Sequence, residues 1–184
     1  MIINEKDRKY TSEEYLTMSE LEWHYELIDG NIIDTSPNPN LKHQRIRLDL
    51  GLYIANYIDG NCLDNEVFFV PLDVTLNRNT VIVPDIFVMC DKGKFDEHGC
   101  VGTPDWVIEI LSPHNSYYDT VEKLALYQKS GVREYWIVDP MNEKVLVYPF
   151  EQAKAVGIFT FADKIIAGIY KDNPEPLVIT INEL

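Results

Sequence analysis

One acidic residue lies in the middle of a long apolar segment, and this limits what the chain can fold into more than any other feature. The segment is Val81–Cys90, which is uncharged except for Asp85, directly after Pro84. A carboxylate buried in such a strand is costly unless a cation or hydrogen-bond donors compensate it. The pattern recurs at Glu109 within Trp106–Leu111. Two such acids on core strands suggest that they share a cation.

A divalent metal ion suits this arrangement. Mg²⁺ is commonly held by one or two carboxylates, with water and substrate phosphate completing its octahedron. The alternative is that each acid pairs separately with Lys, Arg or backbone amides, because ion pairing also stabilises a buried charge. One isolated acid would favour separate pairing. Two acids on successive strands favour a shared site, with Asp85 and Glu109 as ligands of Mg²⁺ or Mn²⁺.

Lys123 is the third ionisable residue of the candidate site. At about 100° per residue it falls about 40° from Tyr127, inside the apolar stripe of its predicted helix. That helix follows the Glu109 strand, so Lys123 can return toward this carboxylate. Lys123 could instead extend to solvent or pair with Asp119. Asp119 itself is either a neighbour of the site or part of a helix cap after Ser116.

The pattern predicts one domain, residues 1–184, of the α/β (α+β) class, with a mixed sheet flanked by helices. Asp29-Gly30 between two apolar runs predicts a hairpin. Helices are expected from Thr11 or Ser12 to Met18–Glu20, over Leu41–Ile58 with Gly60 closing it, and over Ser116–Ser130 with Gly131 as the C′ residue. Strands are expected at Val67–Val70 and Asp73–Leu76, bent around Pro71, and at Val81–Cys90, interrupted only by Pro84-Asp85. Further strands are expected at Trp106–Leu111, Tyr135–Val138, Val145–Phe150 and Leu177–Ile181.

Composition excludes several classes of protein. Hydrophobic residues make up 46% and charged residues 25%, as in globular domains. No apolar run approaches the ~20 residues that span a bilayer. The N-terminal residues lack the apolar segment of a secretory signal, and the three cysteines show no Cys-x-x-Cys spacing. We therefore expect a cytoplasmic protein without a membrane segment or a disulfide framework.

The net charge of -14 argues against tight binding of duplex DNA by this subunit alone. Neutralisation of phosphates by Lys and Arg supplies much of the affinity for nucleic acid. One local concentration of positive charge stands at the start of the second predicted helix, at Lys42, His43, Arg45 and Arg47. This group could contact a nucleic-acid strand, or it could be solvated surface charge.

Several segments together resemble the Uma family of restriction endonuclease-like proteins. They are Tyr25–Gly30, His43-Gln44, Pro71–Val74, Pro84–Ile86, Pro104–Pro113, Asp119–Lys123 and Gly131–Pro140. The likeness runs in order from about residue 11 to residue 150. It implies a PD-(D/E)xK nuclease fold, with Asp85 and Glu109 as metal ligands. Leu111 stands where the superfamily pattern has its lysine, and the family supplies this amine from the following helix, where Lys123 lies.

Other acids and one histidine have weaker assignments. Glu26 resembles an additional acid near such sites, or it forms a structural ion pair. His43 lies on the core face of its helix, where a structural role is favoured over contact with the site. Asp73 is expected to bind backbone amides near a bulge. Asp105 repeats the Pro-Asp pair but would lie ~13 Å from Glu109 along one strand, too far to share an ion.

The resemblance implies a metal-dependent endonuclease that hydrolyses phosphodiester bonds of nucleic acid, with DNA favoured as substrate. Cleavage of both strands needs two sites, so a homodimer is expected. Two alternatives stay open. One is a non-catalytic binding or regulatory module that keeps the nuclease fold, and the other is a metal hydrolase of small phosphoesters.

Overall fold

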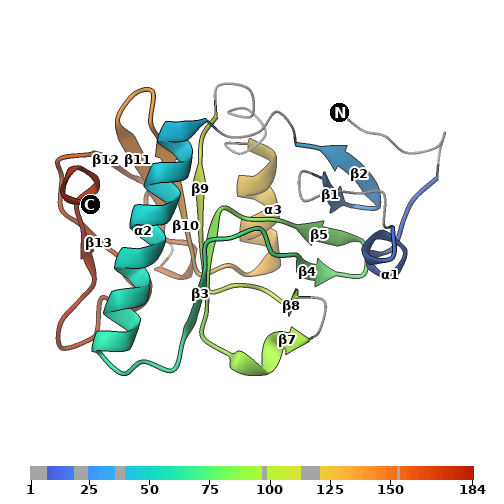
Figure 1. The fold of residues 1–184 in the computed structure, drawn as a ribbon, viewed down its shortest axis with the longest axis horizontal. Coiled ribbons are helices and arrows are strands. Elements are labelled where there is room, and N and C mark those ends of the chain that lie inside the picture. The colour runs from blue at the N-terminus through green and yellow to red at the C-terminus, as the bar shows by residue number, and fades with distance from the viewer. Residues whose placement is uncertain (1–7, 19–24, 36–39, 97–98, 113–120, 153) are drawn as a thin grey trace.

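The structure is a computed structural model that describes residues 8–18, 25–35, 40–96, 99–112, 121–152 and 154–184. Its strands form two mixed sheets and one short pair, which is the α+β architecture predicted (Figure 1). Within the described residues, no helix has the length and apolar character needed to cross a membrane.

The first sheet carries the central strand of the candidate site. Its order is β12 (Gly157–Thr160), β11 (Lys144–Tyr148), β10 (Glu134–Asp139), β9 (Trp106–Ile110), β6 (Ile86–Met89) and β3 (Glu66–Phe68). Strands β9 and β10 are parallel and the other neighbours are antiparallel. Helix α2 (Leu41–Gly60), close to the predicted span, packs its apolar stripe against one face of this sheet.

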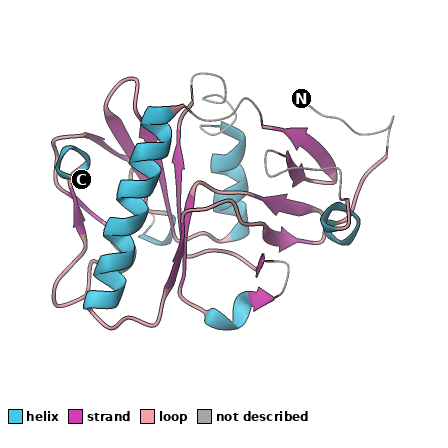
Figure 2. Ribbon diagram, in the orientation of Figure 1, coloured by secondary structure: helices cyan, strands magenta, loops and turns pink. Residues whose placement is uncertain are grey.

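The second sheet begins with the predicted hairpin. Its order is β2 (Asn31–Asp34), β1 (Tyr25–Ile28), β5 (Thr80–Ile82), β4 (Val74–Asn77), β8 (Gly99–Val101) and β7 (Phe95–Asp96). Asp29 and Gly30 turn the hairpin with φ of 47° and 77°, the left-handed region that a two-residue type I′ turn requires. This sheet and helix α3 (Lys123–Ser130) lie on the face of the first sheet opposite α2 (Figure 2).

The segment Val81–Cys90, predicted as one long strand interrupted only by Pro84-Asp85, is two strands that lie in different sheets. The chain leaves β5 in the second sheet, passes Pro84-Asp85 and enters β6 in the first sheet. Pro84 has no N–H to continue a ladder, so the strand ends there. The expected bend around Pro71 is likewise a change of sheet, from β3 to β4. Asp85 therefore lies where the two sheets meet.

The helix ends and the remaining elements differ modestly from prediction. Helix α1 (Ser12–Leu16) has the capping box of Thr11 and Glu14 but ends before Met18. Helix α3 ends at Gly131 as predicted, with φ of 88°, while the predicted cap Ser116 lies outside the described residues. The other elements are β13 (Ile165–Ile166), β14 (Val178–Ile179) and the 3₁₀ helices η1 (Lys92–Lys94), η3 (Phe150–Gln152), η4 (Gly168–Tyr170) and η5 (Ile181–Glu183).

The contact of Gly51 with Phe69 gives a test of the packing of α2. A Cβ at Gly51 would meet Cγ of Phe69 and lie 2.6 Å from its Cδ1 and 2.7 Å from its Cβ. These atoms are near the backbone and cannot move aside easily. We expect Gly51→Ala to lower the free energy of unfolding by about 1–3 kcal/mol, despite the better helix propensity of alanine.

Gly60, on the same helix, is the matched control, because its Cβ would meet nothing within 4 Å. Gly60→Ala should leave the stability unchanged or raise it by up to about 1 kcal/mol. Urea denaturation of both variants measures the difference. Equal effects would contradict the packing described.

Candidate active site

Glu109 is buried on the α3 side of the first sheet. Residues alternate along β9, so Trp106 and Ile108 face α2 while Val107 and Glu109 face α3. Oε1 of Glu109 accepts hydrogen bonds from Nζ of Lys123 at 2.9 Å and from the hydroxyl of Tyr127 at 2.6 Å. These donors compensate the charge that the apolar sequence had predicted to be costly.

Asp85 lies at the crossover between the sheets, beside Glu109. Oδ2 of Asp85 accepts the backbone N–H of Ile110 at 2.8 Å and lies 3.0 Å from Nε2 of His43. The backbone N–H of Asp85 points at Oε2 of Glu109 over 3.4 Å. Its side chain is 18% exposed, whereas that of Glu109 is 4% exposed. The structure thus brings the two predicted acids together, with Asp85 the more exposed of the two.

Lys123 bridges two buried carboxylates. Its Nζ lies 2.9 Å from Oε1 of Glu109 and 3.0 Å from Oε1 of Glu26. The same oxygen of Glu26 accepts the backbone N–H of Val83 at 2.9 Å. Lys123 is buried, so the alternative of a side chain extended to solvent is wrong. Glu26 forms an ion pair and also belongs to the site, while Asp119 lies outside the described residues.

His43 contacts the site, contrary to the structural role favoured from the sequence. Asn40 caps α2 by accepting the backbone N–H of His43 at 3.0 Å, which fixes the first turn of the helix. The ring then reaches Asp85 from the α2 side. Its Nδ1 is buried and has no hydrogen-bond partner among the described residues. Helical spacing placed His43 on the core face, but only the crossover of the chain puts Asp85 opposite it.

Tyr127 is a site residue that the sequence did not identify. It lies one helical turn after Lys123 and is fully buried. Burial, and next the charge of Glu109, raise the pKa of Tyr127 well above its usual value, so the phenol keeps its proton and donates to the carboxylate. Its place in the apolar stripe was visible in the sequence, but an aromatic residue there is as well explained by core packing.

Asp73 adds negative charge on the Glu26 side of the site. Burial, and then the charge of Glu26, raise the pKa of Asp73, and burial with both acids raises the pKa of Tyr15. Among the described residues the carboxylate of Asp73 makes no hydrogen bond, so the expected contact with backbone amides is wrong. Asp105, expected to lie too far from Glu109 to share an ion, binds Arg133 at 3.2 Å and accepts the N–H of Cys90 at 2.8 Å.

The donor set fits a divalent metal ion held by few protein ligands. In the described part of the chain, no three His, Cys, Asp or Glu residues are grouped to hold a metal. Asp85 and Glu109 would therefore supply two carboxylates, as is common for Mg²⁺. Both bonds to the Asp85 side chain fall on Oδ2, and Oδ1 has no partner within the described residues. Among the described residues, the carboxylates of Asp85, Glu109 and Glu26 outnumber the ammonium of Lys123, which also favours a bound cation.

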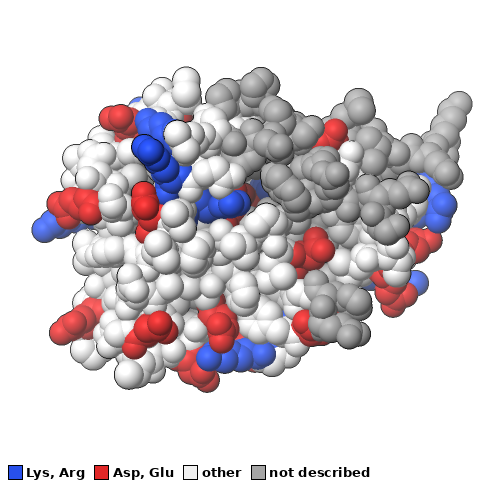
Figure 3. Space-filling view, viewed as in Figure 1, with Lys and Arg blue, Asp and Glu red and all other residues white. Residues whose placement is uncertain are grey.

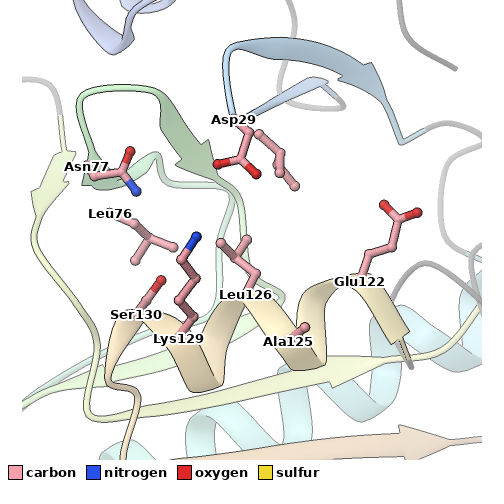
Figure 4. A pocket seen from close by; sticks show the side chains of 9 residues that line it. Asp29, Leu76, Asn77, Glu122, Ala125, Leu126, Lys129 and Ser130 are labelled. Atoms are coloured by element: carbon pink, nitrogen blue, oxygen red, sulfur yellow. The ribbon is translucent and has the colours of Figure 1, made fainter.

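A pocket of about 470 Å³ lies along α3 but is not the candidate site. Asp29 from the β1–β2 turn and Asn77 from the end of β4 face Lys129 and Glu122 of the helix segment across it (Figure 4). Its lining includes none of the predicted site residues that the structure describes.

Comparisons with known proteins agree with the predicted family and fold. The model of the Uma2 family, described as "Putative restriction endonuclease", matches residues 12–167. An uncharacterized protein of Synechocystis sp. is 27% identical over 143 residues, covering 76% of this chain and 74% of that protein. The crystal structure of a "putative nuclease belonging to DUF820" from Anabaena variabilis superposes with a TM-score of 0.75 at 27% identity, covering 94% of this chain and 96% of that one.

The bridge formed by Lys123 can be tested through stability. Lys123→Met would leave Glu109 and Glu26 buried without their shared ammonium, and we expect a loss of about 3–5 kcal/mol in the free energy of unfolding. Adding Glu26→Gln should recover part of this loss. Lys129→Met, on an exposed position of the same helix, should change stability by less than about 0.5 kcal/mol. Urea denaturation at neutral pH measures all three, and equal losses for the two lysines would contradict the bridge.

Because the phenol of Tyr127 stays neutral in the folded protein, we predict that the free energy of unfolding falls at alkaline pH. The folded-state pKa is raised above the ordinary value of 10.0, so above pH 10 the unfolded chain releases this proton while the folded chain retains it. Stability is thus fully present below pH 10 and falls as pH rises, by about 1.4 kcal/mol per pH unit for this group. Tyr127→Phe should be the less stable protein at pH 7, because it lacks the bond to Glu109, and should lose less stability between pH 10 and 11. Parallel slopes for the two proteins would rule this out.

Proposed function

Because the chain belongs to the Uma2 family, we propose that it is a nuclease that hydrolyses phosphodiester bonds of DNA with the help of a divalent metal ion. The observation that carries the proposal is the meeting of Asp85 and Glu109 at the junction of the sheets, with Lys123 bonded to Glu109. The family model and the crystal structure from Anabaena variabilis both carry a nuclease description, which supports the reaction class.

Asp85 and Glu109 would hold the metal. Bound there, Mg²⁺ or Mn²⁺ would act as a Lewis acid at the phosphate and lower the pKa of a bound water. His43 and the N–H of Ile110 bind the same oxygen of Asp85, and so leave its other oxygen without a partner among the described residues. Tyr127 fixes Glu109 in a similar way. The ligands are therefore oriented before substrate arrives.

Lys123 would stabilise negative charge that develops on the phosphate. Its ammonium is held by Glu109 and Glu26, so its position is fixed without rearrangement during the reaction. Glu26 is in turn anchored to the backbone at Val83. In this proposal Glu26 is a positioning residue that acts through Lys123. Cleavage of both strands of a duplex would further require a homodimer, and we propose action in the cytoplasm.

A non-catalytic module with the same fold is the second candidate. The net charge of -14 favours it, because an acidic protein repels a polyanionic substrate. Titration with Mn²⁺ beside the cleavage assay separates the two candidates. Binding of Mn²⁺ that depends on Asp85 and Glu109, without cleavage of any substrate, would favour the module.

The cleavage assay uses plasmid DNA, single-stranded DNA and RNA, with Mn²⁺ or Mg²⁺. We expect DNA to be cut, and chelation of the metal to stop cutting. Asp85→Asn and Glu109→Gln should each lower the rate about 100-fold or more, because each removes a charged ligand while keeping the shape of the side chain.

Asp105→Asn is the matched control, since Asp105 also follows a proline but binds Arg133 rather than the site. It should keep the rate within a few fold while lowering thermal stability. Absence of metal-dependent cleavage, or full activity of Glu109→Gln, would refute the proposed reaction.

A further inference from the structure

Arg47 lies on the side of α2 that faces the candidate site. It follows His43 by one helical turn, about 6 Å along the axis and about 40° around it. It precedes Gly51 by the same interval. Both ends of this row contact the body of the protein, His43 at Asp85 and Gly51 at Phe69. Helical side chains lean toward the N-terminus of their helix, so Arg47 leans toward His43 and the site.

Arg47 is half-buried and makes no ion pair or hydrogen bond with the residues that the structure describes. Other basic side chains are engaged. Lys42 donates to the carbonyl oxygen of Pro140 at 2.6 Å, and Arg133 binds Asp105 and Glu151. A half-buried guanidinium with five donors and no such partner has its hydrogen-bonding capacity available for a ligand. Acidic and basic side chains are mixed on this face, and basic ones gather over the upper half of α2 and beside it (Figure 3).

The charges of the site indicate that this ligand is an anion. The carboxylates of Asp85, Glu109 and Glu26 would be balanced by Lys123 together with one divalent cation. A phosphodiester that enters the site then adds a negative charge with no counterpart among these groups. A planar guanidinium binds two phosphate oxygens at once, which a lysine does not do.

We propose that Arg47 binds a backbone phosphate of the nucleic-acid strand and holds that strand at the metal site. This inference rests on the proposed function for its substrate class. Arg47 would let an acidic protein hold a polyanion next to the reacting groups. No basic patch spread over the surface is then needed.

Arg45 is a matched control on the same helix. It carries the same charge two residues earlier, is exposed, and likewise has no partner in the described residues. It points about 160° away from His43 around the helix axis. General attraction of a polyanion to α2 would involve both arginines equally, whereas a phosphate at the site would involve Arg47 alone.

The experiment measures binding, so it does not depend on turnover. Fluorescence anisotropy follows a labelled single-stranded DNA oligonucleotide with the full chain, in Ca²⁺ and at several salt concentrations. Arg47→Ala should weaken binding about 10-fold or more and reduce the slope of log K against log salt by about 0.7. Arg47→Lys should keep the slope and lose part of the affinity. Arg45→Ala should change affinity by less than about 2-fold, and the thermal stability of all variants should match the parent.

Equal weakening by Arg47→Ala and Arg45→Ala would overturn the proposal, as would the absence of DNA binding by the parent protein. The same measurements distinguish failure of the proposed reaction from failure of the role of Arg47. Binding that depends on Arg47, in a protein that never cleaves DNA, supports this inference and refutes hydrolysis. Cleavage with unchanged affinity in Arg47→Ala supports hydrolysis and refutes the role of Arg47.

Discussion

The buried ammonium of Lys123 joins the parts of the structure on which the site depends. It binds Glu109 from the first sheet and Glu26 from the second, and it stands at the start of α3. A buried charge is tolerable only when it is paired and hydrogen-bonded. All three elements must therefore be in place before any of the three charges can be buried. The position of α3 against both sheets and the geometry of the site are set by the same contacts.

The crossover at Pro84-Asp85 is the second constraint. The chain passes from β5 to β6 there, and the backbone at Val83 is fixed by Glu26. Asp85 is then held by the N–H of Ile110 and by His43 from the opposite side of the first sheet. One short segment thus places an acid between α2 and α3. An acid inside a continuous strand could not be reached from both sides in this way.

The net charge of -14 and a nucleic-acid substrate are compatible if charge is organised locally. Lys123 offsets one of the three acidic charges of the site, and a divalent metal ion would offset the other two. Arg47 lies one helical turn after His43 and has no partner among the described residues. Interactions between exposed charges weaken beyond about 8 Å at physiological salt. The composition of the whole chain is therefore a poor guide to the charge that a phosphate would meet.

The sequence by itself determined that Asp85, Glu109 and Lys123 are unusual, because ionisable groups in apolar strands and stripes are visible as a pattern. It also determined α2, the Asp29-Gly30 hairpin and the end of α3, which depend on local periodicity and turn chemistry. Tertiary structure alone decided that Val81–Cys90 divides between two sheets, since alternation along a strand is the same in either sheet. It also decided the partners of His43 and Tyr127, because a hydrogen bond between residues far apart in the chain depends on how the elements pack.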